Sequence, residues 1–472
     1  MPRLAWFTPL PPTKSGIAQY NWELLPALAS SHQLDLFVDG HPSRFASPDA
    51  SMRVFDAHDF IWKNKREPYD LVVYQLGNAP CHDYMWAYAV RYPGVVVLHD
   101  GQLHHARARA LLHQKRYDDY RSEFWFNHPD AHPDLAELGA EGLLGSLTYF
   151  WPMLRTLVDS SRLVVIHNQW LADQIRGAHP DARVRVIPMG VPPHDPGTAP
   201  QAVRTRHGIP EDAVLFVAFG KVTPEKRITE AIRALASISD AVPNVHLLLA
   251  GETVDYYDVM MNARALGVES KVSVAGFVAD DEVDSYLAAA EVCLCMRWPS
   301  SRETSASWLR CVAAGKPTVT TDLVHTVDIP MLDPRSWNVL SAPASEPSGD
   351  AADRPEGSTD GPDPVGVSID IIDEDHSLKL AMRRLATDGR LRQMLGDKAR
   401  RLWSDRFQLE RMVSGYLDAI AAALILPIPD HASRKALPHH LLDDGTGHAE
   451  RLLREAGLAA ALRNDFWIGR TK

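Results

Sequence analysis

Short apolar runs alternate with longer amphipathic stretches along most of the chain. In the first half the apolar runs are rich in β-branched residues and cover residues 3–8, 34–38, 71–75, 94–99, 163–167 and 184–187. This alternation predicts parallel strands that are joined by crossover helices. Residues 192–201 are rich in proline and interrupt the pattern, so we interpret them as an interdomain linker.

A second series of the same kind follows the linker. It predicts strands at 213–219, 245–250, 272–275, 292–296 and 318–320, with helices at 228–238, 256–266, 281–290 and 305–314. Ile228, Ala231, Ile232 and Leu235 recur at helical spacing and are expected to bury one stripe of their helix on the sheet. The pattern therefore indicates a second doubly wound sheet.

The C-terminal part is less regular. Residues 341–366 consist mainly of Ser, Pro, Gly, Asp and Glu, which predicts a mobile insertion. A strand is expected at 367–372, a basic helix at 377–386, a long helix ending near 426 and an amphipathic helix around 448–462.

The fold class predicted from these patterns is α/β, with two Rossmann-like doubly wound domains. We place the N-terminal domain at 1–191, the linker at 192–203 and the C-terminal domain at 204–400. A helix at 401–426 is expected to cross back to the first domain, and the role of the tail at 427–472 is unassigned.

Composition narrows the class of protein. The 472 residues carry a formal charge of −11 and a pI near 6.0, which argues against a nucleic-acid partner. Four cysteines without a CxxC pair argue against a disulfide framework or a structural metal. The N-terminus lacks a signal-peptide pattern, and the apolar run at 419–429 is too short to cross a bilayer. We expect a cytoplasmic protein, with peripheral membrane contact left open.

Residues 220–227 have the composition of an anion site. They place Lys221 and Lys226 directly after the apolar strand 213–219, with a turn at Gly220 and Pro224 in the position of a first helical residue. Free amides and the positive end of the helix dipole would then favour a phosphate. The alternative is that both lysines are solvated surface residues.

Three other strand ends carry polar residues. Residues 9–20 form a loop in which Gly16 permits close approach of a ligand to the backbone at a helix start. His99 and Asp100 follow the fourth strand, and Asn78 with His82 is expected to line the same cleft. Turn formation, capping and packing are the alternative explanations for these residues. We expect no metal, because His104 and His105 point different ways on a helix.

Residues 299–317 add a further candidate. Thr304 or Ser305 can cap a helix whose first amides point into the cleft, and Glu303 supplies an acceptor for sugar hydroxyls. Arg310 lies two turns into that helix. A capping carboxylate and a surface cation are the alternative interpretations of Glu303 and Arg310.

In this order the segments resemble a retaining glycosyltransferase of the GT-B fold, family 4, over residues 3 to about 423. The resemblance rests on the loop ending at Gly16, the pair His99-Asp100 and four further segments, at 186–191, 220–226, 276–278 and 314–317. It implies a nucleotide-sugar donor held by the second domain, a saccharide or lipid-linked acceptor facing the first, and no metal or other cofactor.

The resemblance also assigns roles to residues. Lys221 and Lys226 would contact the diphosphate, and the Gly16 amide would approach the phosphates. His99 would lie near the reacting sugar, while Phe277 and Val278 fall where the base commonly rests.

One motif departs from the family. The two carboxylates of its Glu, seven residues, Glu pattern align with Arg302 and Arg310, and Glu303 is one position off the first slot. A guanidinium donates hydrogen bonds but accepts none.

The functional hypothesis is transfer of a sugar to an acceptor hydroxyl with retention, in polysaccharide, glycolipid or other glycoconjugate biosynthesis. Its catalytic candidates are His99, Glu303 and Lys226. The donor-binding candidates add Gly16, Lys221, Phe277, Val278, Thr304, Ser305 and Arg310, and the acceptor-side candidates are Asp100, Asn78 and His82. The rivals are a nucleotide-sugar 2-epimerase and a catalytically silent nucleotide-sugar binding subunit. Residues 149–151 are either an apolar landing surface or core.

Overall fold

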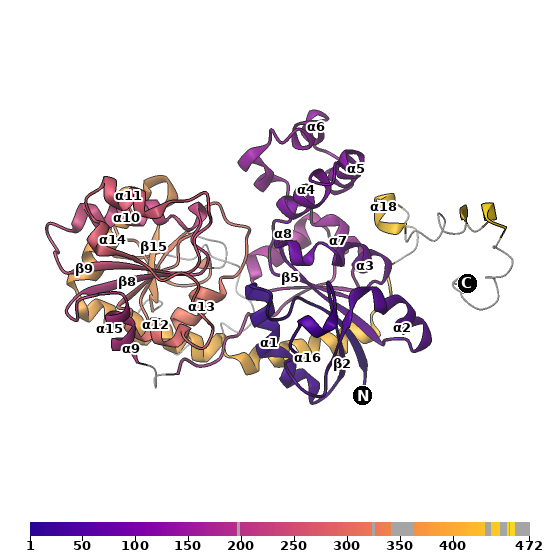
Figure 1. The fold of residues 1–472 in the computed structure, drawn as a ribbon, viewed down its shortest axis with the longest axis horizontal. Helices are drawn as coiled ribbons and strands as arrows, with labels where there is room; N and C mark the ends of the chain where they lie inside the picture. The colour runs from indigo at the N-terminus through magenta and orange to yellow at the C-terminus, as the bar shows by residue number, and fades with distance from the viewer. Residues whose placement is uncertain are drawn as a thin grey trace, which may run out of the picture.

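The computed structural model describes residues 1–195, 199–322, 326–340, 363–429, 436–443, 451–452 and 454–457. Two α/β lobes lie side by side, each built on a mostly parallel sheet with helices on both faces (Figure 1). The predicted fold class is confirmed. Most of the predicted insertion at 341–366 and of the predicted helix at 448–462 lies outside the described residues.

The first sheet has seven parallel strands in the order β3-β2-β1-β4-β5-β6-β7. Their bounds are β1 Arg3–Phe7, β2 Gln33–Val38, β3 Arg53–Asp56, β4 Leu71–Leu76, β5 Val95–Leu98, β6 Leu163–Ile166 and β7 Val184–Val186. Six of them lie at the predicted positions. The sequence pattern missed β3, because this edge strand is short, only half-buried and charged at both ends.

The second sheet has eight strands in the order β10-β9-β8-β11-β12-β15-β13-β14. They are β8 Val214–Phe219, β9 Val245–Ala250, β10 Val272–Val274, β11 Val292–Leu294, β12 Thr318–Thr321, β13 Met331–Leu332, β14 Val339–Leu340 and β15 Gly366–Ile369. Only the β13–β14 pair is antiparallel within this described sheet. Both strands of that pair have two residues, which is too short for a periodic signal.

Helices cover both faces of each sheet. In the first domain they are α1 Gly16–Ala29, α2 Phe60–Arg66, α3 Met85–Arg91, α7 Arg155–Ser160 and α8 Gln169–Ala178. In the second they are α9 Pro200–Arg206, α10 Ile228–Ile238, α11 Val259–Ala265, α12 Val283–Ala289, α13 Ala306–Ala313, α14 Glu374–Thr387 and α15 Gly389–Arg406. Helix α9 begins inside the range that we assigned to the linker.

A helical excursion leaves the first sheet between β5 and β6. It contains α4 (His104–Leu112), α5 (Tyr117–Asn127), α6 (Asp134–Ala140) and the 3₁₀ segment η4 (Gly145–Phe150), and it stands above its domain in Figure 1. It has a small core of its own, made by Leu111, Tyr120, Phe124, Ala136, Ala140 and Met153. The tail helix α18 (His439–Leu442) packs against α3 nearby.

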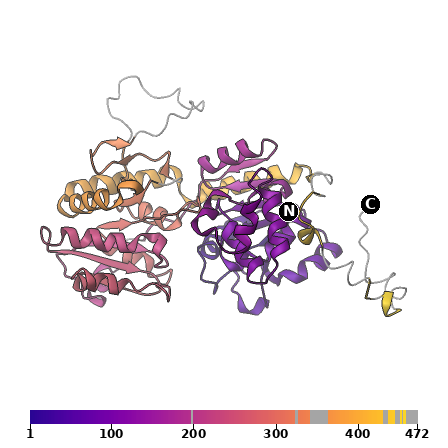
Figure 2. The same cartoon turned by 90° about the horizontal axis from the view of Figure 1, so that it is seen from above.

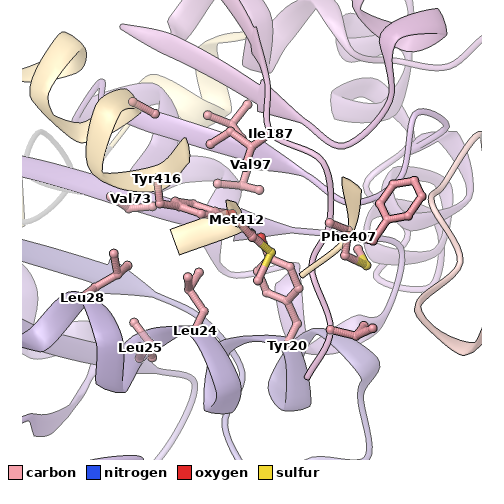
Figure 3. Packing of buried hydrophobic residues seen from close by; sticks show 14 of the residues in the cluster. Tyr20, Leu24, Leu25, Leu28, Val73, Val97, Ile187, Phe407, Met412 and Tyr416 are labelled. Carbon is pink, nitrogen blue, oxygen red and sulfur yellow. Dashed lines mark hydrogen bonds between the residues drawn. The ribbon is translucent and has the colours of Figure 1, made fainter. Parts of the chain in front are cut away.

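The helix predicted at 401–426 is divided, because α15 ends at Arg406 and α16 spans Leu409–Ile425, close to the predicted end. The amide of Val191 donates a 3.0 Å hydrogen bond to the Phe407 carbonyl, so the break between the helices is paired with the linker. Beyond the break α16 runs back beneath the first domain (Figures 1 and 2) and packs against α1. Figure 3 shows Met412 and Tyr416 of α16 among Leu24, Leu25 and Val73 of that domain.

Candidate functional site

The end of β8 forms a compact cationic corner. Lys226 folds back so that its Nζ donates a 2.7 Å hydrogen bond to the Phe219 carbonyl. Gly220 between them has a φ of +89°, and a Cβ built there would lie 3.0 Å from the ammonium. Glycine is therefore required at this turn both for its backbone conformation and for the space that Lys226 occupies.

The prediction that Pro224 begins the helix is wrong. Residues Pro224–Lys226 form a single 3₁₀ turn, Arg227 adopts a left-handed conformation with φ +58°, and α10 begins only at Ile228. The first amides of α10 are thus separated from Lys226 by a reversal of the chain. The helix start that lines this corner belongs to another helix, α13.

Lys226, Arg297 and the start of α13 line one small cavity at the carboxyl ends of β8 and β11. It has a volume of about 10 Å³ and is lined by Phe219, Lys226, Leu294, Cys295, Met296, Arg297, Glu303, Ser305 and Ser307. Ser305 caps α13, since its hydroxyl accepts a 3.2 Å hydrogen bond from the Trp308 amide. Arg297 pairs with Glu303 at 2.8 Å. The helix start and two cations therefore surround the same point.

The ammonium of Lys226 is destabilised by its surroundings. Burial, and then the neighbouring guanidinium of Arg297, lower the pKa of Lys226 to about 8. The carboxylate of Glu303 acts in the opposite direction. An anion that enters this corner would stabilise the charged form of the lysine and raise its pKa.

On the facing edge of the first sheet, His99 is buried and fixed. Its Nε2 donates a 2.6 Å hydrogen bond to Gln75 Oε1, and the edge of the ring meets Tyr20 with centroids 4.8 Å apart. Burial and the nearby His167 and His82 hold the pKa of His99 well below its usual value. The imidazole is therefore neutral near pH 7, and Nδ1 is left as its acceptor.

Asp100 is the titratable acid of this edge. Its Oδ2 accepts a 2.8 Å hydrogen bond from the Asn78 amide. Burial, and then the carboxylate of Glu303, raise the pKa of Asp100 to about 7. The carboxyl groups of Asp100 and Glu303, one from each domain, thus interact electrostatically across the cleft.

Asn78 and His82 hold the local structure together. The side-chain amide of Asn78 donates a 2.6 Å hydrogen bond to the Gln102 carbonyl. The ring of His82 is fully buried and donates from Nδ1 to the Gln75 carbonyl at 2.9 Å. Burial lowers the pKa of His82 to about 4, which keeps it neutral.

The two domains touch at several points around this site. The Gly101 amide donates a 2.7 Å hydrogen bond to the Ser301 carbonyl. Arg310 of α13 forms an ion pair with Glu23 of α1, so its guanidinium faces the other domain.

A second contact spans the domains beside the first. Lys14 pairs with Glu252 at 3.3 Å and also lies 4.7 Å from the ring centroid of Phe277. The described arrangement is closed, with a cavity that holds about one water molecule.

The remaining predicted residues lie around the rim. Lys221 is exposed, and Phe277 is 57% exposed. Val278 packs against the core of the second domain. Thr304 lies 3.5 Å from the Asn168 amide group, and Gly16 opens α1 with no heavy atom within 4 Å of its would-be Cβ.

Arg302 does not face the cavity. It has a left-handed φ of +62°, and its guanidinium lies 5.4 Å from the Trp170 ring of the first domain. The carboxylate that lines the cavity is that of the next residue, Glu303.

Sequence reasoning missed three residues of this site. Arg297 follows β11 at its carboxyl end, a position that could have marked it. Gln75, which fixes His99, lies inside a buried strand and gave no signal. Tyr149 of the helical excursion interacts electrostatically with Glu303 and Arg297, and its ring packs against His105 with centroids 5.0 Å apart.

In the part of the chain that the structure describes, no group of three or more His, Cys, Asp or Glu is arranged to hold a metal ion. Within the same residues, no helix is long and apolar enough to span a membrane.

Comparison with known proteins agrees with this architecture. A sucrose-phosphate synthase from Thermosynechococcus elongatus superposes with a TM-score of 0.58 at 14% identity, covering 89% of this chain and 100% of that one. The chain has the GT-B fold. Anabaena HepE in complex with UDP-glucose, at 14% identity, gives a TM-score of 0.56 over 89% of this chain and 99% of that one.

The family match lies in the second domain. Residues 213–336 match the family model described as Glycosyl transferases group 1. A 2-deoxystreptamine glucosyltransferase from Streptomyces kanamyceticus is 27% identical over 139 residues, which are 28% of this chain and 35% of that protein. The chain thus aligns with about a third of the length of this curated relative.

Proposed function

We propose that the protein is a glycosyltransferase that moves a sugar from a nucleotide-diphosphate sugar to an acceptor hydroxyl with retention of configuration. The observation that carries the proposal is the cavity at which Lys226, Arg297 and the start of α13 converge. It lies at the carboxyl ends of parallel strands, where doubly wound domains bind ligands, and it faces the other domain. The family match at 213–336 covers this corner.

The charge pattern suits the departing diphosphate. As the glycosidic bond breaks, negative charge grows on the phosphate oxygens while the sugar becomes cationic. Lys226 and Arg297 would stabilise that charge together with the amides of α13. These protein groups supply the compensation in our proposal, so it assigns no role to a divalent ion.

The facing edge would receive the sugar. His99 is neutral and fixed by Gln75, so it suits a hydrogen bond to a sugar hydroxyl rather than protonation of the leaving group. Retention would follow from attack on the same face, with the departing phosphate taking the acceptor proton. The small volume of the closed cavity means that donor entry requires the domains to part.

The test is a transfer assay with labelled nucleotide sugars. UDP-glucose is the first donor to try, because a structural neighbour is described as a complex with it. We expect slow hydrolysis without acceptor, faster transfer with cell-derived acceptors, and a product whose anomeric signal in NMR matches the donor. Conversion of donor alone into its epimer would establish the epimerase instead. Binding without turnover would establish the silent subunit.

A further inference from the structure

A second, much larger hollow lies on the first domain, outside the site described above. It is a groove of about 940 Å³ that follows α8 on one side and is bounded on the other by α7 and the loops at 127–131 and 150–154. Its volume is at the upper end of the range of about 300–1,000 Å³ found for small-molecule sites. The groove therefore offers room for an extended ligand.

The groove leads to the proposed reaction centre. Arg302 of the second domain lines it, and the next residue along the chain, Glu303, lines the cavity that contains Lys226. The carbonyl of Arg302 also accepts a 3.3 Å hydrogen bond from Asn168, the residue that caps α8. A ligand in the groove thus has one end next to the place where a sugar would be transferred.

The lining of the groove is amphipathic. Phe150 is 72% exposed and Trp151 is half-buried, and both present aromatic surface to it. The exposed carboxylates of Asp130 and Asp181 at the groove are hydrogen-bond acceptors for hydroxyl groups. Aromatic faces with planar polar groups beside them match the two kinds of surface that a sugar ring presents.

The charges that line the groove cancel near pH 7. The charged lining residues are three acids and three arginines: Asp130, Asp159, Asp181, Arg155, Arg183 and Arg302. Arg155 is already paired with Asp159 at 3.1 Å. Burial lowers the pKa of His128 to about 4, and burial also lowers the pKa of His179, so neither histidine adds charge. This balance disfavours a phosphorylated sugar or an anionic membrane surface.

We propose that this groove binds the acceptor, and that the acceptor is an uncharged oligosaccharide whose end projects past Arg302 into the cleft. The inference rests on the proposed function and names its acceptor class. The Phe150–Trp151 segment, which also allowed interpretation as a membrane landing surface, is here assigned to saccharide binding.

The experiment uses the full chain and three classes of probe. Saturation-transfer NMR measures binding of the neutral trisaccharides maltotriose, cellotriose and chitotriose, and of glucose 6-phosphate. A separate sedimentation assay measures binding to phosphatidylglycerol vesicles. The groove is filled in the variant Gln174→Trp, whose wild-type residue is an exposed, groove-lining position of α8. The control Arg176→Trp places the same indole at an exposed position of α8 that does not line the groove.

We expect binding of at least one neutral trisaccharide, a loss of about tenfold or more in Gln174→Trp, and little change in Arg176→Trp. Titration with UDP should be the same in all three proteins, which separates this inference from the proposed donor site. Binding of no neutral trisaccharide would overturn the inference while leaving the donor site intact. Preference for glucose 6-phosphate or vesicles, or equal binding by Gln174→Trp, would overturn it as well.

Discussion

Lys226 is the residue whose chemistry the proposal uses most directly. Its pKa is lowered to about 8, so the ammonium is fully charged below pH 7 and loses its proton as the pH rises through 8. We expect the affinity for a nucleotide diphosphate to be constant from pH 6.5 to 7.5 and to fall above pH 8. Isothermal titration calorimetry with UDP checks this. Lys226→Arg should flatten the profile, since guanidinium does not titrate there, and an unchanged slope would exclude Lys226 as its source.

Asp100 gives a prediction for stability. Its carboxyl has a pKa near 7 in the folded protein against an ordinary value of 3.8, so ionisation opposes folding increasingly as the pH rises from about 4 through 7. We expect Asp100→Asn to raise the free energy of unfolding at pH 8 by about 1–3 kcal/mol, and to have little effect at pH 4. Urea denaturation at the two pH values measures it. A loss of stability at pH 8 would contradict the assigned pKa.

Among the elements, the crossing of the linker over the start of α16 leaves no room for a side chain at Gly190. A Cβ on Gly190 would lie 2.5 Å from the Gln408 carbonyl oxygen, which is a backbone atom and not the far end of a flexible side chain. We expect Gly190→Ala to destabilise the protein by about 1–3 kcal/mol, as overpacking does. Thermal denaturation provides the measurement. The control Gly177→Ala on α8 meets no atom within 4 Å and should be neutral or slightly stabilising.

Sequence periodicity was sufficient to predict the regular strands and helices. It was insufficient where tertiary contacts determine where an element begins or ends. Buried strands such as β8 and the amphipathic helix α10 carry strong local signals, and they lie where the pattern put them. The break between α15 and α16 depends on a hydrogen bond from Val191, about 200 residues away, so no local pattern encodes it. The left-handed turn at Arg227 likewise could not be predicted, because no glycine marks it in the sequence.

The candidate site divides in the same way. The sequence located Lys226, Glu303 and Ser305, because they follow strands or cap a helix. It did not find Gln75, whose effect on His99 depends on two strands lying side by side. Nor could it show that Arg310 faces Glu23 rather than the cavity, since that contact joins two domains.

For the whole molecule, the ion pair between Arg310 and Glu23 joins α13 of the second domain to α1 of the first. Both side chains are largely shielded from solvent, at 22% and 14% exposure. We expect Arg310→Glu to repel Glu23 and to increase the radius of gyration in small-angle X-ray scattering. In the double variant Arg310→Glu/Glu23→Arg the radius of gyration should return toward the wild-type value. A double-mutant cycle of the free energies of unfolding should give a coupling energy of about 1–3 kcal/mol. Absence of coupling would show that the pair does not hold the domains.

The central claim is that a diphosphate binds between the domains at Lys226, and one calorimetric comparison tests it most directly. UDP, GDP and ADP are titrated at pH 7 into the wild-type protein, Lys226→Met and the control variant Lys65→Met. Lys65 is an exposed residue of α2, on the far side of the first domain (Figure 1). We predict that the best of these ligands binds Lys226→Met about tenfold to a hundredfold more weakly, with Lys65→Met unchanged. Equal affinity in wild type and Lys226→Met, or no binding by the wild type, would contradict the account.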